Sequence, residues 1–161
     1  MTGPIDTVLD TLPPSAAADV VRRWFTALEV QDLAELGALM ARDVVIELPF
    51  SESGRTDPGH FRVYDGHAAC VEFWTVAFEA EGDGGPLLDP EVTVSADGTT
   101  VFVEGRGDIT MASGRRYRNR YVMRMVLRDG LVAHVREYYN PIVSAYAFGR
   151  PVAGQILLES L

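Results

Sequence analysis

The stretch from Tyr117 to Asn140 reads YRNRYVMRMVLRDGLVAHVREYYN, and its pattern determines how the rest of the chain can be arranged. Side chains of opposite character alternate along it, and Asp129-Gly130 interrupts the alternation, which is typical of two β-strands joined by a tight turn. The odd-numbered positions are mostly apolar or aromatic, whereas many even-numbered positions are arginine. Because successive side chains of a strand point to opposite faces, this hairpin has one apolar and one basic face.

The length of the turn decides which residues of the two strands face each other. A two-residue Asp129-Gly130 loop would pair Arg128 with Leu131. It would bring the arginines at even-numbered positions of the first strand, here called the arginine row, onto the face of Leu131. A three-residue loop, with Gly130 in the left-handed conformation, would instead pair Leu127 with Leu131. A slip of one residue in the pairing of the strands would exchange the two faces. We therefore predict the three-residue loop, which places apolar side chains of one strand beside apolar side chains of the other.

The predicted register places a carboxylate on the apolar face, with Glu137 opposite Tyr121. The same odd-with-odd register across the preceding turn places Gly105 opposite Tyr121 and Gly107 opposite Asn119. Glycine inside a strand leaves empty space, so we predict a cavity on the face that carries Glu137. The alternative, compatible with the first, is that these glycines only allow the strand to bend.

The remaining elements follow from apolar periodicity, helix caps and turn residues. We predict a flexible arm over residues 1–14, a helix from Ser15, a second short helix from Asp32, a strand over 43–50, a polar loop over 51–65, a helix from Gly66 to about Glu81, strands over 91–95 and 99–111, the hairpin, and a short helix or turn after Asn140-Pro141. We expect one domain over residues 15–150 and a C-terminal tail over 151–161, in which Leu157 and Leu158 pack on the domain or on a partner. A loop as long as 51–65 is often a lid or a binding loop.

Composition limits the function classes. The chain has 161 residues, 47% of them hydrophobic, and a net charge of −9, which argues against nucleic acid as a partner. We expect Glu104 and Asp108 to lie beside the arginine row on the neighbouring strand. No apolar run has the length of a membrane span, and residues 1–14 lack the features of a secretory signal, so we expect a cytoplasmic protein with no membrane partner.

The sequence lacks the residues that several kinds of catalytic chemistry require. The sequence contains no lysine, which excludes Schiff-base chemistry, and its single cysteine, Cys70, excludes disulfides and thiolate metal clusters. His60, His67 and His134 have no metal-ligand spacing, and no nucleotide-binding glycine loop or serine nucleophile elbow occurs. We therefore expect no metal and no cofactor, and either no chemistry or chemistry by carboxylates, tyrosines and histidine.

The order of elements resembles the α+β fold of the nuclear transport factor 2-like (NTF2-like) superfamily, which includes SnoaL-like cyclases and ketosteroid isomerases. Its motifs are most similar to those of the phenazine-biosynthesis PhzA/PhzB family, and the residues that carry this resemblance are Tyr117-Arg118-Asn119, Asp129-Gly130, Arg136-Glu137-Tyr138-Tyr139-Asn140-Pro141 and Ala147-Phe148-Gly149. The resemblance implies a cone-like, curved, mostly antiparallel sheet wrapped by three helices. It also implies that Glu137 is an acid/base group and that Tyr117 contacts the ligand. The family's pocket histidine falls at Phe73, which is a departure from the pattern.

We therefore predict a small cofactor-free acid/base enzyme of secondary metabolism, of the isomerase, cyclase or dehydratase type, acting on a hydrophobic, carbonyl-containing and cyclic or polyketide-like substrate. Glu137 would transfer the proton, because burial of a carboxylate raises its pKa. The expected substrate-binding residues are Tyr117, Asn119, Tyr121, Phe73, Trp74, Tyr139 and His67. The alternatives are a non-catalytic metabolite-binding protein and a structural dimerisation domain on the same fold. By analogy with the superfamily we expect a homodimer.

Overall fold

The fold is taken from a computed structural model of the chain and is described for residues 3–152. In chain order the elements are α1 (Pro4–Leu9), α2 (Ala16–Glu29), α3 (Leu33–Leu39), β1 (Met40–Leu48), β2 (Arg62–Asp65), α4 (His67–Glu81), β3 (Leu88–Val94), β4 (Thr100–Thr110), β5 (Arg116–Arg128), β6 (Leu131–Tyr139) and α5 (Pro141–Phe148). Most of the predicted tail over residues 151–161, including Leu157 and Leu158, lies outside the described part of the chain.

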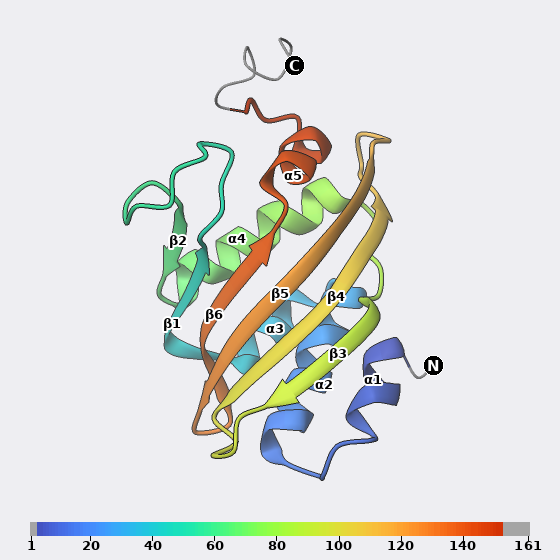
Figure 1. Cartoon of the computed structure of the whole chain (residues 1–161), viewed down its shortest axis with the longest axis vertical. Coiled ribbons are helices and arrows are strands. Elements are labelled where there is room, and N and C mark those ends of the chain that lie inside the picture. Colours follow the sequence, from blue (N-terminus) through green and yellow to red (C-terminus); the bar gives the residue numbers. More distant parts are fainter. Residues whose placement is uncertain (1–2, 153–161) are drawn as a thin grey trace.

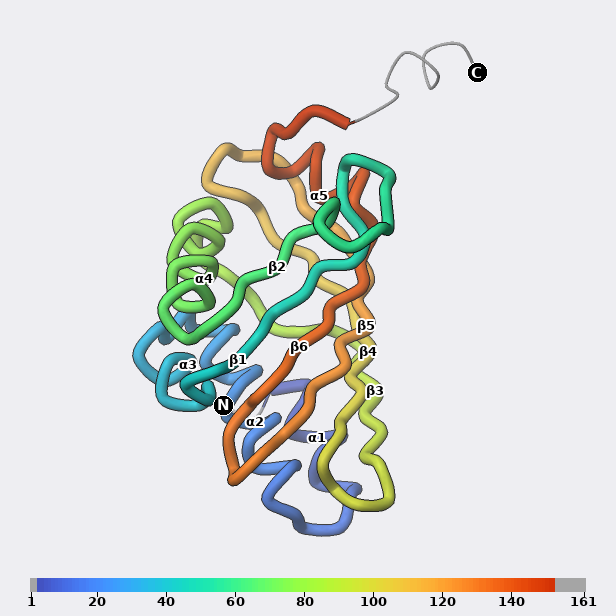
Figure 2. The backbone as a smooth tube through the Cα atoms, turned by 90° about the vertical axis from the view of Figure 1, so that its left-hand side faces the viewer, coloured from blue at the N-terminus to red at the C-terminus, as the bar shows by residue number. Residues whose placement is uncertain are grey.

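The six strands form one curled sheet in the order β2-β1-β6-β5-β4-β3 (Figure 1). All neighbouring strands are antiparallel except β1 and β6, which run parallel. Helices α2, α3 and α4 cover one face of this sheet, and α5 lies at one end of it (Figure 2). The predicted α+β class, with a curved and mostly antiparallel sheet wrapped by helices, is confirmed.

The turn of the central hairpin differs from the prediction. Arg128 pairs with Leu131, so the loop has two residues, and Asp129 and Gly130 have φ values of 54° and 75°. Positive φ at both positions is the geometry of a type I′ turn, whose twist matches that of the flanking strands. The three-residue loop was therefore the wrong prediction.

A β-bulge restores the separation of the two faces. Leu127 pairs with Val132 but Val126 pairs with His134, so Ala133 is the extra residue of β6. An extra residue shifts the register of everything beyond it by one position. Odd positions therefore face odd positions after all, but Glu137 lies opposite Met123 rather than opposite Tyr121.

The register of the next strand pair agrees with the prediction. Gly105 pairs with Tyr121 and Gly107 pairs with Asn119 along β4 and β5. On the outer face of the same pair, the guanidinium groups of Arg116 and Arg118 form ion pairs with Asp108. Asp108 therefore lies beside the arginines of β5 as expected, and Glu104 lies on the same strand opposite Val122.

Two segments that were predicted to lack regular structure contain it. Residues 1–14 were expected to be a flexible arm, but α1 packs Ile5 and Leu9 into the core with 4% and 2% of their surfaces exposed. Arg22 of α2 binds the carboxylates of Asp6 and Asp10, each at 2.8 Å, and holds α1 in place. The last four residues of the predicted loop 51–65 form β2, which extends the sheet beyond β1.

The two helix starts that were predicted from caps are confirmed. The Ser15 hydroxyl accepts a hydrogen bond from the Ala18 amide at the start of α2, and the Asp32 carboxylate accepts one from Glu35 at the start of α3. Asn140 caps α5 in the same way, through the amides of Ile142 and Val143. In the described residues, no helix is long and apolar enough to cross a bilayer.

Candidate active site

A hollow lies between α4 and the concave face of the sheet. The cavity volume is about 120 Å³, measured as the space open to the centre of a water-sized molecule. Helices α2 and α4, the segment after α4, and strands β4, β5 and β6 provide its walls, which consist of Phe25, Leu28, Trp74, Phe78, Glu81, Gly84, Gly85, Pro86, Leu87, Gly107, Ile109, Tyr117, Tyr121, Met123 and Glu137. Most of these side chains are apolar, so the two carboxylates are exceptions that need an explanation.

A second compartment, with a cavity volume of about 70 Å³ on the same measure, adjoins the first on the side of β1, β2 and α5. The two compartments share five wall residues, which are Trp74, Glu81, Tyr117, Tyr121 and Glu137. Phe73, Tyr139 and Arg62 line only the second compartment. The shared residues therefore stand at the boundary, where a bound molecule could contact both carboxylates.

Glu137 projects from β6 at this boundary. It retains some accessible surface because it faces the hollow, but protein surrounds its carboxylate. Burial raises the pKa of Glu137 to about 7, with the nearby charge of Glu81 acting in the same direction and that of Arg62 in the opposite one. A carboxyl group with a pKa near neutrality can serve as acid or as base under physiological conditions.

Glu81 is the second carboxylate of the hollow, and we did not identify it as a functional residue from the sequence. Burial raises its pKa to about 7 as well. It is the last residue of α4, whose final turn contains no basic residue. The sequence did hold a signal, because Glu81 continues the stripe of Trp74 and Phe78 at positions i, i+4 and i+7 of the helix.

Three tyrosines surround the carboxylates. Burial raises the pKa of Tyr117 and, more strongly, that of Tyr121, so both phenols keep their protons. Burial also raises the pKa of Tyr139 to about 12, and its hydroxyl accepts a hydrogen bond from Arg62. Neutral tyrosines beside a hollow are available as hydrogen-bond donors to an oxygen of a bound molecule.

The two glycines of β4 make room for side chains as well as for the hollow. A Cβ atom at Gly107 would lie 3.3 Å from the ring and the hydroxyl of Tyr121, and Gly107 lines the hollow. A Cβ atom at Gly105 would lie 2.6 Å from Cγ of Leu87. The cavity predicted from these glycines is therefore present beside Gly107, while Leu87 occupies the space above Gly105.

The aromatic residues of α4 form the wall opposite the sheet. Trp74 contacts Phe73 with ring centroids 4.8 Å apart, and Phe73 stacks on Tyr64 of β2 at 4.4 Å. Trp74 is 9% exposed, and its indole nitrogen is buried without a hydrogen-bond partner among the described residues. Trp74 thus lines both compartments, whereas Phe73 lines only the second and lies where the resemblance would place a histidine.

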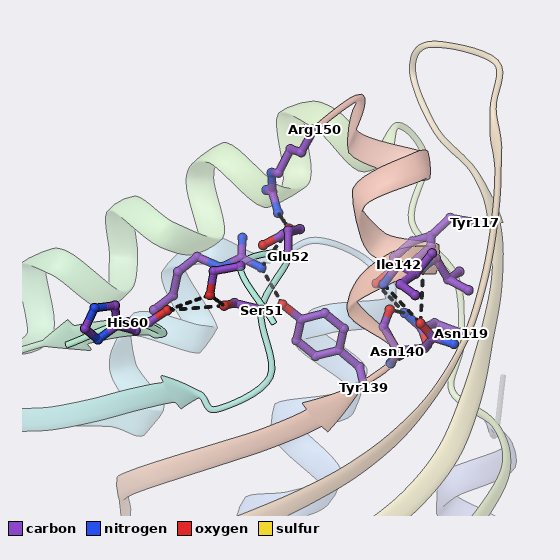
Figure 3. A network of polar contacts seen from close by, with 12 residues as sticks. Ser51, Glu52, His60, Tyr117, Asn119, Tyr139, Asn140, Ile142 and Arg150 are labelled. Carbon is purple, nitrogen blue, oxygen red and sulfur yellow. Dashed lines mark hydrogen bonds and ion pairs between the residues drawn. The ribbon is translucent and has the colours of Figure 1, made fainter. Parts of the chain in front are cut away.

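Asn119 lies outside both compartments, and its side chain is held by hydrogen bonds within the protein. Its side-chain amide donates to the carbonyl of Asn140 and to the hydroxyl of Tyr117, at 3.0 and 3.2 Å (Figure 3). Its carbonyl oxygen accepts hydrogen bonds from the backbone amides of Asn140 and Arg120. These contacts occupy the side chain and fix the start of α5 against β5.

His67 also lies away from the predicted position. Its Nε2 atom is 2.8 Å from the carbonyl oxygen of Gly37 in α3, and neither compartment includes it. It joins α4 to α3, so the histidine does not replace the one that is absent at Phe73. Among the described residues, no three His, Cys, Asp or Glu side chains are arranged to hold a metal ion.

A charged cluster lies beside the second compartment, which Arg62 and Arg150 line. Glu52, from the loop after β1, accepts a hydrogen bond from Arg150 at 3.0 Å (Figure 3). It also accepts one from Arg62 at 3.4 Å. Despite burial, these contacts and a backbone hydrogen bond lower the pKa of Glu52, so it remains ionised. The loop 51–61 is thereby tied to the chain segment that follows α5, at the end of the hollow.

Comparison with known proteins places this geometry in a family. The chain is 26% identical over 134 residues to the uncharacterized protein YesE of Bacillus subtilis (strain 168), which covers 83% of this chain and 87% of YesE. A Bacillus subtilis structure named "Putative Isomerase" is 25% identical with a TM-score of 0.73, over 85% of this chain and 95% of that one.

A phenazine biosynthesis-related protein of Pseudomonas aeruginosa, phzb2, has the same fold. Its TM-score is 0.65 at 21% identity, over 85% of this chain and 87% of that chain. The sequence profile of the SnoaL-like domain matches residues 21–135, which include α4 and most of the sheet. The chain therefore belongs to the SnoaL-like domain family.

Proposed function

We propose that this protein is a cofactor-free acid/base catalyst of the isomerase, cyclase or dehydratase type. Its substrate would be a small, largely apolar and cyclic or polyketide-like molecule that carries a carbonyl group. Glu137 would remove or supply a proton at a carbon next to that carbonyl. The observation that supports this role is a carboxylate with a pKa of about 7 in the wall of an apolar hollow.

The remaining wall residues support the same chemistry. Removal of a proton next to a carbonyl leaves negative charge on the oxygen, and preorganised donors stabilise that charge. Tyr117 and Tyr121 line both compartments beside Glu137 and keep their protons. The apolar walls would exclude water and hold a ring. Homologues named for isomerisation and phenazine biosynthesis agree with a reaction of this type.

Exchange of carbon-bound hydrogen tests the proposal without knowledge of the natural substrate. We would incubate the protein with 1-indanone, an apolar cyclic ketone, in deuterium oxide and follow loss of the α-proton signal by NMR. The protein should accelerate the exchange, and Glu137→Gln should reduce the acceleration at least about 100-fold, a typical loss for a general base. Full exchange by folded Glu137→Gln would remove Glu137 from this role.

A second function has one observation in its favour. The histidine that the resemblance leads one to expect is replaced by Phe73, and His67 binds the carbonyl of Gly37 outside both compartments. The same hollow would then bind a hydrophobic metabolite without converting it. Tight binding of cyclic ketones by calorimetry, together with no hydrogen exchange in the bound ligand, would favour this function.

A further inference from the structure

We propose that the second compartment is the subsite for the oxygen-bearing end of the ligand, where the side chains of Trp74 and Arg62 donate hydrogen bonds to an acceptor oxygen. The apolar ring of the ligand would then lie in the first compartment. The proposal deepens the proposed function and rests on it only for the presence of a carbonyl group in the ligand. It makes Trp74 and Arg62 specificity-determining residues.

Two buried donors on the wall of the second compartment have no acceptor among the described residues. One is Nε1 of Trp74 on α4, and the other is Nε of Arg62 on β2. Both side chains line the second compartment, and Trp74 is only 9% exposed. Almost all buried polar groups of folded proteins are hydrogen-bonded, so two unpaired donors beside one cavity indicate a partner that enters the cavity.

The chemistry of these groups defines that partner. An indole N–H donates and cannot accept, and every nitrogen of a guanidinium group is likewise only a donor. Tyr139 provides a third donor, because its hydroxyl accepts a hydrogen bond from Nη2 of Arg62 and keeps its own hydrogen for another acceptor. The matching group of a ligand is an oxygen with free lone pairs, as in a carbonyl or carboxyl group.

The carboxylates of the hollow do not satisfy these donors. Glu81 and Glu137 line the same compartment. Neither of them is bonded to Nε1 of Trp74 or to Nε of Arg62. The donors are therefore left for a bound molecule, and Glu137 is left for the proton that it would remove.

The charges beside the second compartment favour the same kind of group. Glu52 accepts one hydrogen bond from Arg62 and another from Arg150, so a single carboxylate serves two guanidinium groups. This cluster of three residues has one positive charge in excess. It attracts an oxygen that carries partial or full negative charge, whereas the first compartment offers mostly apolar side chains to a ring.

This placement also orients the ligand for the proposed reaction. Trp74 and Glu137 line both compartments, whereas Arg62 lines the second and not the first. A carbonyl oxygen in the second compartment would therefore put the neighbouring carbon at the boundary, on the side of Glu137. The volume of about 70 Å³ is enough for a small polar group, because one water molecule needs only about 10–15 Å³ on this measure.

The indole signal of Trp74 reports this hydrogen bond. The chain has two tryptophans, and the other one, Trp24, lines neither compartment. We would label tryptophan with nitrogen-15 and titrate the protein with 1-indanone and with indane, which has the same rings without the oxygen. The N–H proton of Trp74 should move downfield with indanone and not with indane, and the Trp24 signal should change little. An equal response of Trp74 to both ligands would overturn the proposal.

Affinities test the two donors. Calorimetry gives the ratio of the affinity for indanone to that for indane, in which the common contribution of the rings cancels. Trp74→Phe keeps an aromatic ring without the N–H, and Arg62→Lys keeps the charge without Nε. Each variant should lower the ratio about 3–10-fold, the factor that corresponds to one hydrogen bond. Phe78→Leu, an apolar change in the first compartment, should weaken both ligands alike and leave the ratio in place.

The outcomes separate this subsite from the proposed function. A lowered ratio in Trp74→Phe, together with no acceleration of hydrogen exchange by the wild-type protein, would keep the subsite and overturn the proposed function. An unchanged ratio in folded Trp74→Phe would overturn the subsite, as would the absence of indanone binding by the wild-type protein. If Trp74→Phe does not fold, the ratio in Arg62→Lys decides the matter in the same way.

Discussion

Glu137 occupies a place where a carboxylate costs folding free energy. Its neighbours across the strands, Met123 and Tyr121, and the facing residues of α4 are largely apolar. A carboxyl whose pKa rises on folding from 4.5 to about 7 binds its proton more tightly in the folded state. Stability is therefore present in full below the unfolded pKa and is lost as pH rises through the folded value.

The first prediction concerns this pH dependence. Glu137→Gln should be more stable than wild type at pH 8, by up to roughly 3 kcal/mol, the free energy that corresponds to the shift in pKa. The difference should vanish near pH 4, where both the folded and the unfolded wild-type proteins are protonated. Urea unfolding at several pH values measures it, with exposed Glu79→Gln as the control. A variant less stable than wild type at pH 8 would contradict the burial argument.

Asn119 provides the second prediction at the scale of one residue. Asn119→Ala removes the partners of the Asn140 amide and carbonyl and of the Tyr117 hydroxyl. Buried polar groups that lose their partners should destabilise the protein by about 2–4 kcal/mol. Denaturant unfolding measures the loss, and Asn140→Ala, which removes only an exposed helix cap, should cost about 1 kcal/mol. An equal loss of unfolding free energy in the two variants would show that the side chain of Asn119 does not hold the start of α5 against β5.

Strands β4 and β5 carry the third prediction, at the scale of the element. Gly105→Ala places a Cβ atom within 2.8 Å of three atoms of Leu87 and should cost about 1–3 kcal/mol. In a Leu87→Ala background the same change should cost less, because the clash is gone. A double-mutant cycle of unfolding free energies measures this coupling. Additive costs would show that Leu87 does not occupy the space above Gly105.

The central hairpin shows what a sequence pattern can and cannot predict about an element. The alternation of apolar and polar residues identified both strands and the face on which each side chain lies. It could do so because a strand with one buried face needs an apolar residue at every second position. It could not reveal that the turn has two residues and that a bulge at Ala133 compensates for it. The shorter turn and the bulge each shift the register by one residue, and the two shifts cancel in the alternation of side chains. The residue opposite Glu137 was therefore predicted incorrectly.

The remaining differences have similar physical causes. Three prolines in residues 1–14 suggested an arm, but Pro4 occupies the first turn of α1, where no amide donor is needed. Glu81 was treated only as the end of its helix, although its position on the apolar stripe directs it inwards. Asn119 lies on the inner face as predicted, yet the turn into α5 uses all its polar atoms, and this depends on contacts distant in sequence.

At the scale of the whole molecule, the order of elements and the motifs of residues 117–151 were sufficient for the fold class and the family. They did not predict how α4 lies over the sheet, and this arrangement brings the carboxylates of Glu81 and Glu137 to one hollow. Glu81 and Glu137 are 56 residues apart in the sequence, so their approach depends on packing between distant elements. Local sequence patterns do not encode such packing.

The fourth prediction concerns association. We propose that two copies pair through the outer face of the sheet, where Phe102 and Val122 are 41% and 37% exposed among charged neighbours. Light scattering should give twice the chain mass of 17.6 kDa, and Val122→Asp should reduce it to the mass of one chain. Val76→Asp, at an equally apolar but helical position of the opposite layer, should remain paired. A wild-type protein with the mass of one chain would refute this surface.

The parallel pairing of β1 with β6 has a consequence for biosynthesis. Residues 40–48 pair with residues 62–65 on one edge and with residues 131–139 on the other, so roughly four-fifths of the chain must leave the ribosome before this strand is bordered on both edges. Until then Val44 and Ile46 have no completed interior to enter, and the nascent polypeptide offers an open strand edge to aggregation. Slower translation of the last third should therefore lower the soluble yield more than slower translation of the first.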